Sequence, residues 1–89
     1  MRRVRAVVTG DVQGVGFRYA ARDHALELGL AGWVRNTPHG AVEAEIEGES
    51  GVVERMLAWL DRGPQAARVA SVEVTEIPVV HETAFAIRS

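Results

Sequence analysis

The chain has 89 residues, of which 47% are hydrophobic and 25% are charged, and its formal net charge is −2. These values are typical of one globular domain, and we expect a single domain over residues 1–89. The negative charge argues against nucleic-acid binding, and no apolar run approaches the ~20 residues of a membrane helix. The absence of cysteine excludes disulfides and thiolate metal sites. Because the basic N-terminus lacks the apolar core of a signal peptide, we expect a cytoplasmic location.

The first predicted strand is Arg3–Thr9, where apolar and polar residues alternate. Its even-numbered residues would face the core, and Arg3 and Arg5 would face solvent. A loop with glycines at positions 10, 14 and 16 follows the strand. The apolar spacing then becomes helical, which predicts a helix over Phe17–Leu28 with Gly29 as its C-terminal cap.

A β-hairpin is predicted next, from the strands Gly32–Asn36 and Ala41–Gly48. The turn between them contains Pro38 and Gly40, which suit a type I turn. In the second strand every other residue is a glutamate, and we expect these side chains to form a solvated face of the sheet. The glutamates are Glu43, Glu45 and Glu47.

A second helix is predicted from the cap Ser50 to the breaker Gly63-Pro64. Two further strands follow, over Ala70–Ile77 and Thr83–Arg88. In the first of these strands, Val72 and Val74 would point inward. The element order is therefore β-α-β-β-α-β with a short extra C-terminal strand. This order predicts an α+β, ferredoxin-like sandwich, in which two helices cover one face of an antiparallel sheet.

The glycine-rich loop that joins the first strand to the first helix is the strongest candidate site. The first amides of a helix have no intrahelical partner and favour anions. Arg18 stands in this first turn, where a cation is disfavoured by the helix dipole. Loop amides and a guanidinium at one place indicate a site for an oxyanion. A tight turn and a solvated arginine are the simpler explanations. The loop is no Walker motif, and Tyr19 replaces the third glycine of a dinucleotide fingerprint.

Topology adds Asn36 to this candidate site. The strands that end at the glycine-rich loop and at Asn36 run in the same direction with one strand between them, so they end at the same edge of the sheet. Two strand spacings are roughly 10 Å, a gap that a loop and a long side chain can bridge. An asparagine can both donate and accept, so Asn36 suits a water molecule. A water beside a held phosphoryl group would indicate hydrolysis, although a turn residue before Pro38 is the simpler explanation.

Two motifs of this sequence resemble those of the acylphosphatase family. The first, Gly-x-Val-Gln-Gly-Val-x-Phe-Arg, is matched by residues 10–18, with Asp11 at a position that the family usually fills with a basic or neutral residue. The chain also ends on Phe85-Ala86-Ile87-Arg88, which is similar to the family. The second motif is matched by Gly32, Trp33, Asn36, Gly40, Val42 and Gly48. The resemblance covers essentially the whole chain.

The resemblance implies a hydrolase that cleaves the carboxyl-phosphate bond of acyl phosphates and uses no cofactor or metal. It implies that Arg18 binds phosphate and that Asn36 orients the attacking water. The backbone amides of Gln13, Gly14, Val15, Gly16 and Phe17 would cradle the phosphate. Asp11 would weaken phosphate affinity if its carboxylate points inward. His39, in the turn, could contact the rest of a substrate.

Two other functions stay open at this point. The first is an anion-binding regulatory module, or part of a larger carbamoyl-phosphate-handling protein, that binds without turnover. The second is an RNA-binding domain, which would need exposed sheet aromatics and a basic face. With a net charge of −2 and five aromatic residues, the RNA-binding function is the weaker one. We expect a monomer with a small-molecule acyl phosphate as substrate and with no nucleic-acid or membrane partner.

Overall fold

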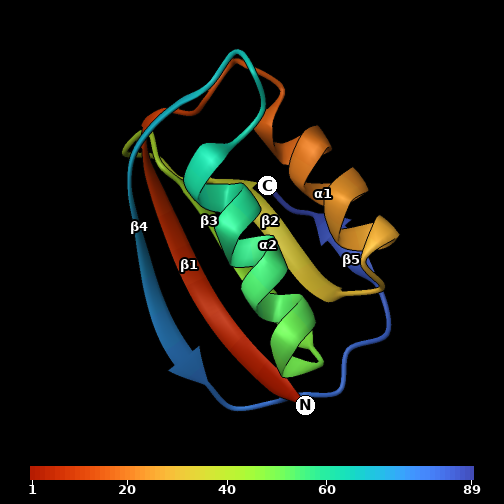
Figure 1. Cartoon of the computed structure of the whole chain (residues 1–89). Helices are drawn as coiled ribbons and strands as arrows, with labels where there is room; N and C mark the ends of the chain where they lie inside the picture. The colour runs from red at the N-terminus through yellow and green to blue at the C-terminus, as the bar shows by residue number, and fades with distance from the viewer.

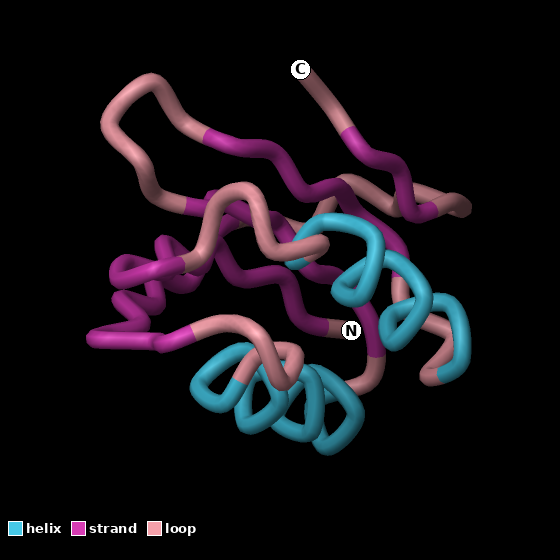
Figure 2. The backbone as a smooth tube through the Cα atoms, turned by 90° about the horizontal axis from the view of Figure 1, so that it is seen from above, coloured by secondary structure: helices cyan, strands magenta, loops and turns pink.

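The computed structural model describes all 89 residues, and it contains one sheet and two helices (Figure 1). In chain order the elements are β1 (Arg2–Asp11), α1 (Phe17–Glu27), β2 (Ala31–Asn36), β3 (Val42–Gly48), α2 (Ser50–Arg62), β4 (Arg68–Ile77) and β5 (Phe85–Ile87). The predicted β-α-β-β-α-β order with an added strand is confirmed. Both helices cover the same face of the sheet (Figures 1 and 2). Neither helix has the length and apolar character needed to cross a membrane.

The sheet has the strand order β4-β1-β3-β2-β5. Neighbours among the first four strands are antiparallel, whereas β5 runs parallel to β2. The prediction of an antiparallel sheet is therefore wrong at the last strand, and the sheet is mixed. The reason is that the chain leaves β4 at the end of the sheet where β2 begins, and residues 78–84 then lead to the opposite edge (Figure 1). A strand that starts there runs beside β2 in the same direction.

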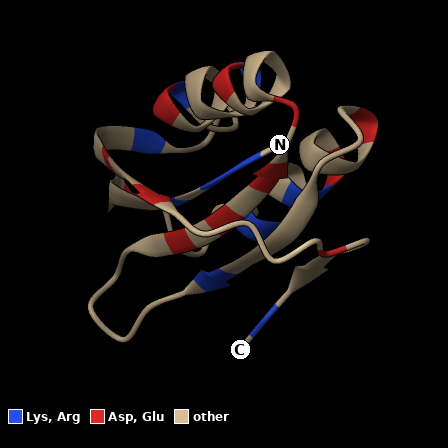
Figure 3. Cartoon of the chain, turned by 90° about the horizontal axis from the view of Figure 1, so that it is seen from below, with Lys and Arg blue, Asp and Glu red and all other residues tan.

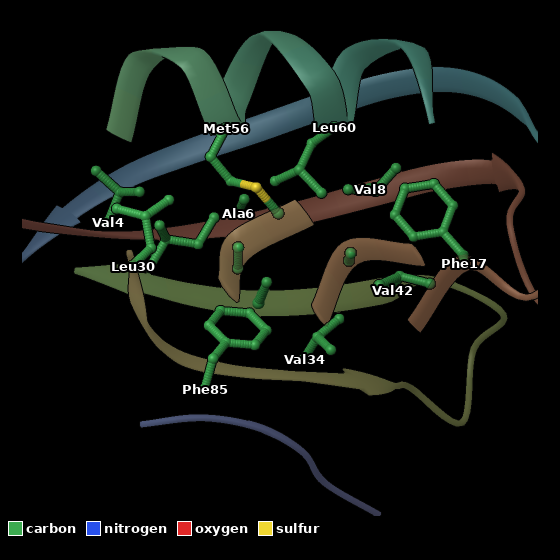
Figure 4. Packing of buried hydrophobic residues seen from close by; sticks show 14 of the residues in the cluster. Val4, Ala6, Val8, Phe17, Leu30, Val34, Val42, Met56, Leu60 and Phe85 are labelled. Atoms are coloured by element: carbon green, nitrogen blue, oxygen red, sulfur yellow. The ribbon is translucent and has the colours of Figure 1, made fainter. Parts of the chain in front are cut away.

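The core lies between the sheet and the helices (Figure 4). Alternate residues of β1 and β3 point toward the helices, as the sequence pattern predicted. Helix α1 packs over β2 and β5, and α2 packs over β1, β3 and β4. The fully buried side chains include Val4, Val8, Phe17, Val34, Val42, Ile46, Val53, Met56 and Leu60. This core fixes the ends of β1 and β2 and the start of α1 against one another.

The helix caps are partly as predicted. Gly29 follows α1 with φ +71°, and its amide donates to Leu26 while the Leu30 amide donates to Ala25. This pattern is a Schellman motif, so Gly29 is confirmed as the cap. The predicted cap of α2 is wrong by one residue: Ser50 begins the helix, and Glu49 accepts a hydrogen bond from the Gly51 amide at 2.9 Å. A glutamate is less common than serine in this role.

The paired strands β1 and β4 are longer than predicted. A bulge follows Thr9, after which Gly10 pairs with Val69 and Asp11 with Arg68. Val72 and Val74 pair with Val8 and Ala6, so both point to the helix face as predicted. Val72 packs against the core, but Val74 is 44% exposed and is not buried. The strand β4 lies at the edge of the sheet, where helix α2 covers it from one side only.

The face of the sheet opposite the helices carries alternating charges (Figure 3). Basic residues of β1 and β2 flank the acidic residues of β3, and Arg35 bonds Glu43 at 2.7 Å. The prediction that Arg3 and Glu47 are solvated is wrong, because both are buried. The chain after β4 covers this end of the face: the Val80 amide donates to Glu47, and Glu82 pairs with Arg3. Arg3 bonds three carboxylates, and the Oε1 atom of Glu47 accepts from Arg3 and Val80, so both charges are paired where they lie out of water.

Candidate active site

The loop between β1 and α1, residues 12–16, is here called the glycine loop. Gly14 and Gly16 have φ values of +75° and +76°, and both residues are exposed. A Cβ atom added at either glycine would meet no atom within 4 Å. The backbone conformation, and not lack of space, therefore requires glycine at these two positions. Gly16 is the N-cap residue of α1 and supplies no side-chain cap.

The amides of this region form a run without acceptors in the protein. The first backbone hydrogen bond of α1 joins the Ala20 amide to the Gly16 carbonyl at 3.1 Å. None of the amides from Gln13 to Tyr19 donates a hydrogen bond to the protein. Successive free amides at a helix start, with left-handed glycines between them, are typical of phosphate and carboxylate sites.

Arg18 is the second residue of α1 and is half-buried. It takes part in no ion pair and donates no hydrogen bond within the protein. The first turn of α1 contains no acidic residue. A guanidinium in this position adds five N–H donors to a helix end that already carries partial positive charge. The combination strongly favours a bound anion.

Asn36, the last residue of β2, lies at the same edge of the sheet as the glycine loop. Val42 of β3 pairs with Val8 of β1 on one side and with Asn36 on the other, so the three residues form a row across the sheet. Figure 4 shows Val42 with Val8 and Phe17 at this end of the core. The Asn36 Oδ1 atom is buried and accepts no hydrogen bond from the protein. A buried acceptor without a donor is costly unless a ligand or a water molecule binds it.

The Gln13 side chain connects the two halves of the site, which the sequence did not predict. Its Nε2 atom donates to the carbonyl oxygens of Thr37 and Ala41, each at 2.8 Å. Both carbonyls belong to the hairpin turn, residues 37–41, which follows Asn36. The sequence singled out Gln13 for its backbone amide only. The signal for the side chain was present, because the predicted topology already placed the loop beside this turn.

Two other predicted residues lie at the margins of the site. Asp11 is exposed at the end of β1, opposite Arg68 of β4, and forms no ion pair. His39 is exposed in the hairpin turn. No group of three His, Asp, Glu or Cys side chains that could hold a metal ion is present. Chemically, the arrangement offers hydrogen-bond donors for a phosphate-like anion and one acceptor for a water.

The chain is similar to known proteins over most of its length. A family model described as Acylphosphatase matches residues 4–87. The acylphosphatase of Acaryochloris marina is 49% identical over 84 residues, which are 94% of this chain and 90% of that protein. The acylphosphatase of Methylococcus capsulatus is 50% identical over 98% of this chain and 96% of its own length.

Solved structures support the same assignment. The crystal structure of acylphosphatase from Bacillus subtilis superimposes with a TM-score of 0.95, at 34% identity and with all of both chains covered. A ferredoxin-like fold is therefore confirmed. An anion-binding module without turnover, the alternative that the sequence left open, is not favoured by these relatives. From the match over residues 4–87 and the identities near 50%, the chain belongs to the acylphosphatase family of hydrolases.

Proposed function

We propose that this acylphosphatase binds the phosphoryl group of its substrate with Arg18 and with the amides of Gln13, Gly14, Val15, Gly16 and Phe17. Asn36 orients the attacking water. The substrate is a small-molecule acyl phosphate, and the products are a carboxylate and inorganic phosphate. The observation that carries the proposal is the run of free amides that leads directly to an unpaired arginine at the start of α1.

Binding precedes the chemistry. The amides donate to phosphoryl oxygens, and the guanidinium fork of Arg18 can bond two of these oxygens at once. Both interactions offset the negative charge of the phosphoryl oxygens, which would otherwise repel the lone pair of the attacking water. Because the donors are fixed by backbone conformation, they need little reorganisation as charge moves during the reaction.

Hydrolysis then needs a positioned water and a good leaving group. The buried Oδ1 atom of Asn36 accepts a hydrogen bond from the water and directs its lone pair toward phosphorus. A P–O bond to the water forms, and the P–O bond to the acyl oxygen breaks. The electron pair leaves with the carboxylate, and the water proton passes to the new phosphate or to solvent. Positioning and charge stabilisation supply most of the rate in such transfers.

Turnover of benzoyl phosphate by purified variants tests these roles. Arg18→Lys keeps the charge but loses the planar fork, and we expect kcat/KM to fall ~10²–10³-fold. Asn36→Ala should lower kcat, while the inhibition constant for inorganic phosphate changes little. Arg22→Lys is the matched control, because Arg22 lies one turn further along α1 and bonds only Asp23. A wild-type rate in Arg18→Lys would overturn its role, and loss of phosphate binding in Asn36→Ala would overturn the assignment to water.

The remaining expectations from the sequence stay predictions. They are a single domain over residues 1–89, a monomeric state, a cytoplasmic location, the use of no cofactor, and no nucleic-acid or membrane partner. Sedimentation equilibrium tests the monomer directly, because a dimer would double the mass of 9.6 kDa.

A further inference from the structure

Gln13 has the only polar side chain of the glycine loop, and the proposed mechanism does not use this side chain. A side-chain amide nitrogen has two N–H donors, and both are directed at main-chain carbonyls of the hairpin turn. The two bonds, each at 2.8 Å, have ordinary length for strong N–H···O contacts. The side chain is half-buried, so these bonds are partly shielded from water.

The hairpin turn that receives these bonds is itself closed by hydrogen bonds. The Thr37 amide donates to the Ala41 carbonyl at 2.8 Å, and the Gly40 amide donates to the Thr37 carbonyl at 3.3 Å. The Thr37 Oγ1 atom accepts from the amides of His39 and Ala41. The turn therefore behaves as a stiff unit, and a bond to it fixes the residue that enters it. That residue is Asn36.

No other hydrogen bond joins residues 12–16 to residues 37–41. The β1–β3 pairing ends at Val8 and Val42, and the β2–β3 pairing ends at Asn36 and Val42. Beyond these residues, only the Gln13 amide group bonds the glycine loop to the turn.

We propose that Gln13 is a positioning residue, which holds Asn36 at the correct distance and angle from the phosphate bound by the glycine loop. This inference rests on the roles proposed above for Arg18 and Asn36. Phosphorus is placed by the loop amides, and the water is placed by Asn36, so the attack distance depends on the link between them. A misplacement of about 1 Å in such an arrangement can reduce a rate ~10²-fold.

The first test is Gln13→Met, which keeps the length of the side chain, removes both donors and leaves the backbone amide intact. We expect kcat for benzoyl phosphate to fall roughly 10- to 100-fold. The inhibition constant for inorganic phosphate should change less than about threefold, because the cradle itself is preserved. Gln65→Met is the matched control, since Gln65 is exposed in the α2–β4 connection and forms no hydrogen bond. An unchanged kcat, or a loss of phosphate binding as large as the loss of kcat, would overturn the proposal.

A double-mutant cycle with Asn36→Ala separates this proposal from the one on which it rests. If Gln13 acts through Asn36, Gln13→Met should cost little once Asn36 is replaced. Equal losses in both backgrounds would overturn the role of Gln13 while leaving that of Asn36 intact. A wild-type kcat in Asn36→Ala alone would overturn the proposed role of Asn36, and the role of Gln13 with it.

A second variant, Gln13→Glu, keeps the proposal testable if the methionine variant does not fold. A carboxylate cannot donate to the two carbonyls, whereas a carboxylic acid donates one hydrogen bond. The ratio of variant to wild-type kcat should therefore rise as the pH falls through the carboxyl pKa. This rise should be absent in the Asn36→Ala background. A ratio that does not depend on pH would contradict the positioning role.

Discussion

Arg3 and Glu47 form a buried ion pair on the face of the sheet opposite the helices. The Arg3 Nη1 and Glu47 Oε1 atoms are 3.2 Å apart, and the two side chains are 2% and 0% exposed. Arg3 also pairs with Glu45 and Glu82, and the Val80 amide donates to Glu47 at 2.8 Å. This cluster joins β1 and β3 to the segment that leads into β5. Arg3 lies near the start of β1, whereas the glycine loop follows the end of this strand. Substitutions in the cluster should therefore change stability rather than activity.

Removal of Arg3 should be strongly destabilising. Arg3→Leu leaves the buried Glu47 carboxylate beside an apolar side chain, and loss of one partner of a buried pair typically costs about 3–5 kcal/mol. The free energy of unfolding in urea measures this effect. Arg5→Leu is the control, because Arg5 is on the same strand but is exposed, and its ion pair with Glu43 is long, at 3.9 Å. Equal destabilisation by the two substitutions would contradict the role given to burial.

Acid should weaken the same cluster. Burial alone would raise the pKa of Glu47, but hydrogen bonds from Val80 and Arg3, together with the charge of Arg3, hold this pKa below its usual range. A carboxyl with a depressed pKa in the folded state stabilises the protein above the unfolded pKa of about 4.3. This stabilisation is lost as the pH falls below that value and through the folded pKa.

The comparison of wild type with Glu47→Gln over pH 3–7 isolates this effect, because all other carboxyls are common to both proteins. We expect a difference in unfolding free energy that is constant near neutral pH and shrinks in acid. The measurement is urea unfolding at each pH. A difference that stays constant down to the lowest pH would show that Glu47 keeps an ordinary pKa.

The sequence pattern predicted the buried apolar residues of β1 but not its buried charge. Alternation along β1 correctly placed Val4, Ala6 and Val8 in the core, because period 2 in a strand depends only on local geometry. The same alternation placed Arg3 in solvent. Its burial depends on residues 78–84, which are far along the chain and have no regular pattern of their own. Only their path in space, set by the direction of β5, covers this end of the sheet.

A glycine of the second motif has a packing role that the sequence alone did not show. Gly32 has φ +136°, and a Cβ atom there would lie 1.9 Å from the Glu45 carbonyl oxygen of β3. Gly32→Ala should therefore destabilise the fold by about 2–4 kcal/mol, through the unfavourable φ and the clash with backbone. Gly51→Ala is the control, because its Cβ would meet only the flexible Glu49 side chain, at 3.3 Å. Thermal or urea unfolding that ranks Gly51→Ala as the worse variant would contradict this explanation.

Some residues of the candidate site could be predicted from the sequence, whereas other features of the site could not. Arg18 and Asn36 followed from the helix dipole and from the parallel direction of β1 and β2, which the order of elements already determines. The topology also placed the glycine loop beside the hairpin turn, but the two acceptors of the Gln13 side chain depend on the conformation of that turn, which the sequence pattern does not determine. The extension of β1 to Asp11 was also missed, because Gly10 interrupts the strand pattern and the pairing resumes only after a bulge.

That extension bears on how Asp11 affects the substrate. Asp11 is exposed at the end of β1, next to the glycine loop, and no ion pair neutralises it. A dianion bound by the loop amides should be repelled by this carboxylate. Asp11→Asn should therefore lower the inhibition constant for inorganic phosphate, by roughly two- to fivefold at low ionic strength. The gain should disappear near 1 M salt, where the screening length is about 3 Å.

Glu27→Gln is the matched control for Asp11→Asn. Glu27 is an exposed acidic residue at the other end of α1, about 15 Å from the glycine loop by helix rise. Glu27→Gln changes the net charge by the same amount as Asp11→Asn. Competitive inhibition by phosphate at 10 mM and 1 M salt, measured with benzoyl phosphate, compares the two variants. If both variants gain affinity equally, net charge and not the place of Asp11 sets the effect. If Asp11→Asn gains none at low salt, its carboxylate points away from the bound phosphate, and the departure from the family motif at this position has no electrostatic consequence.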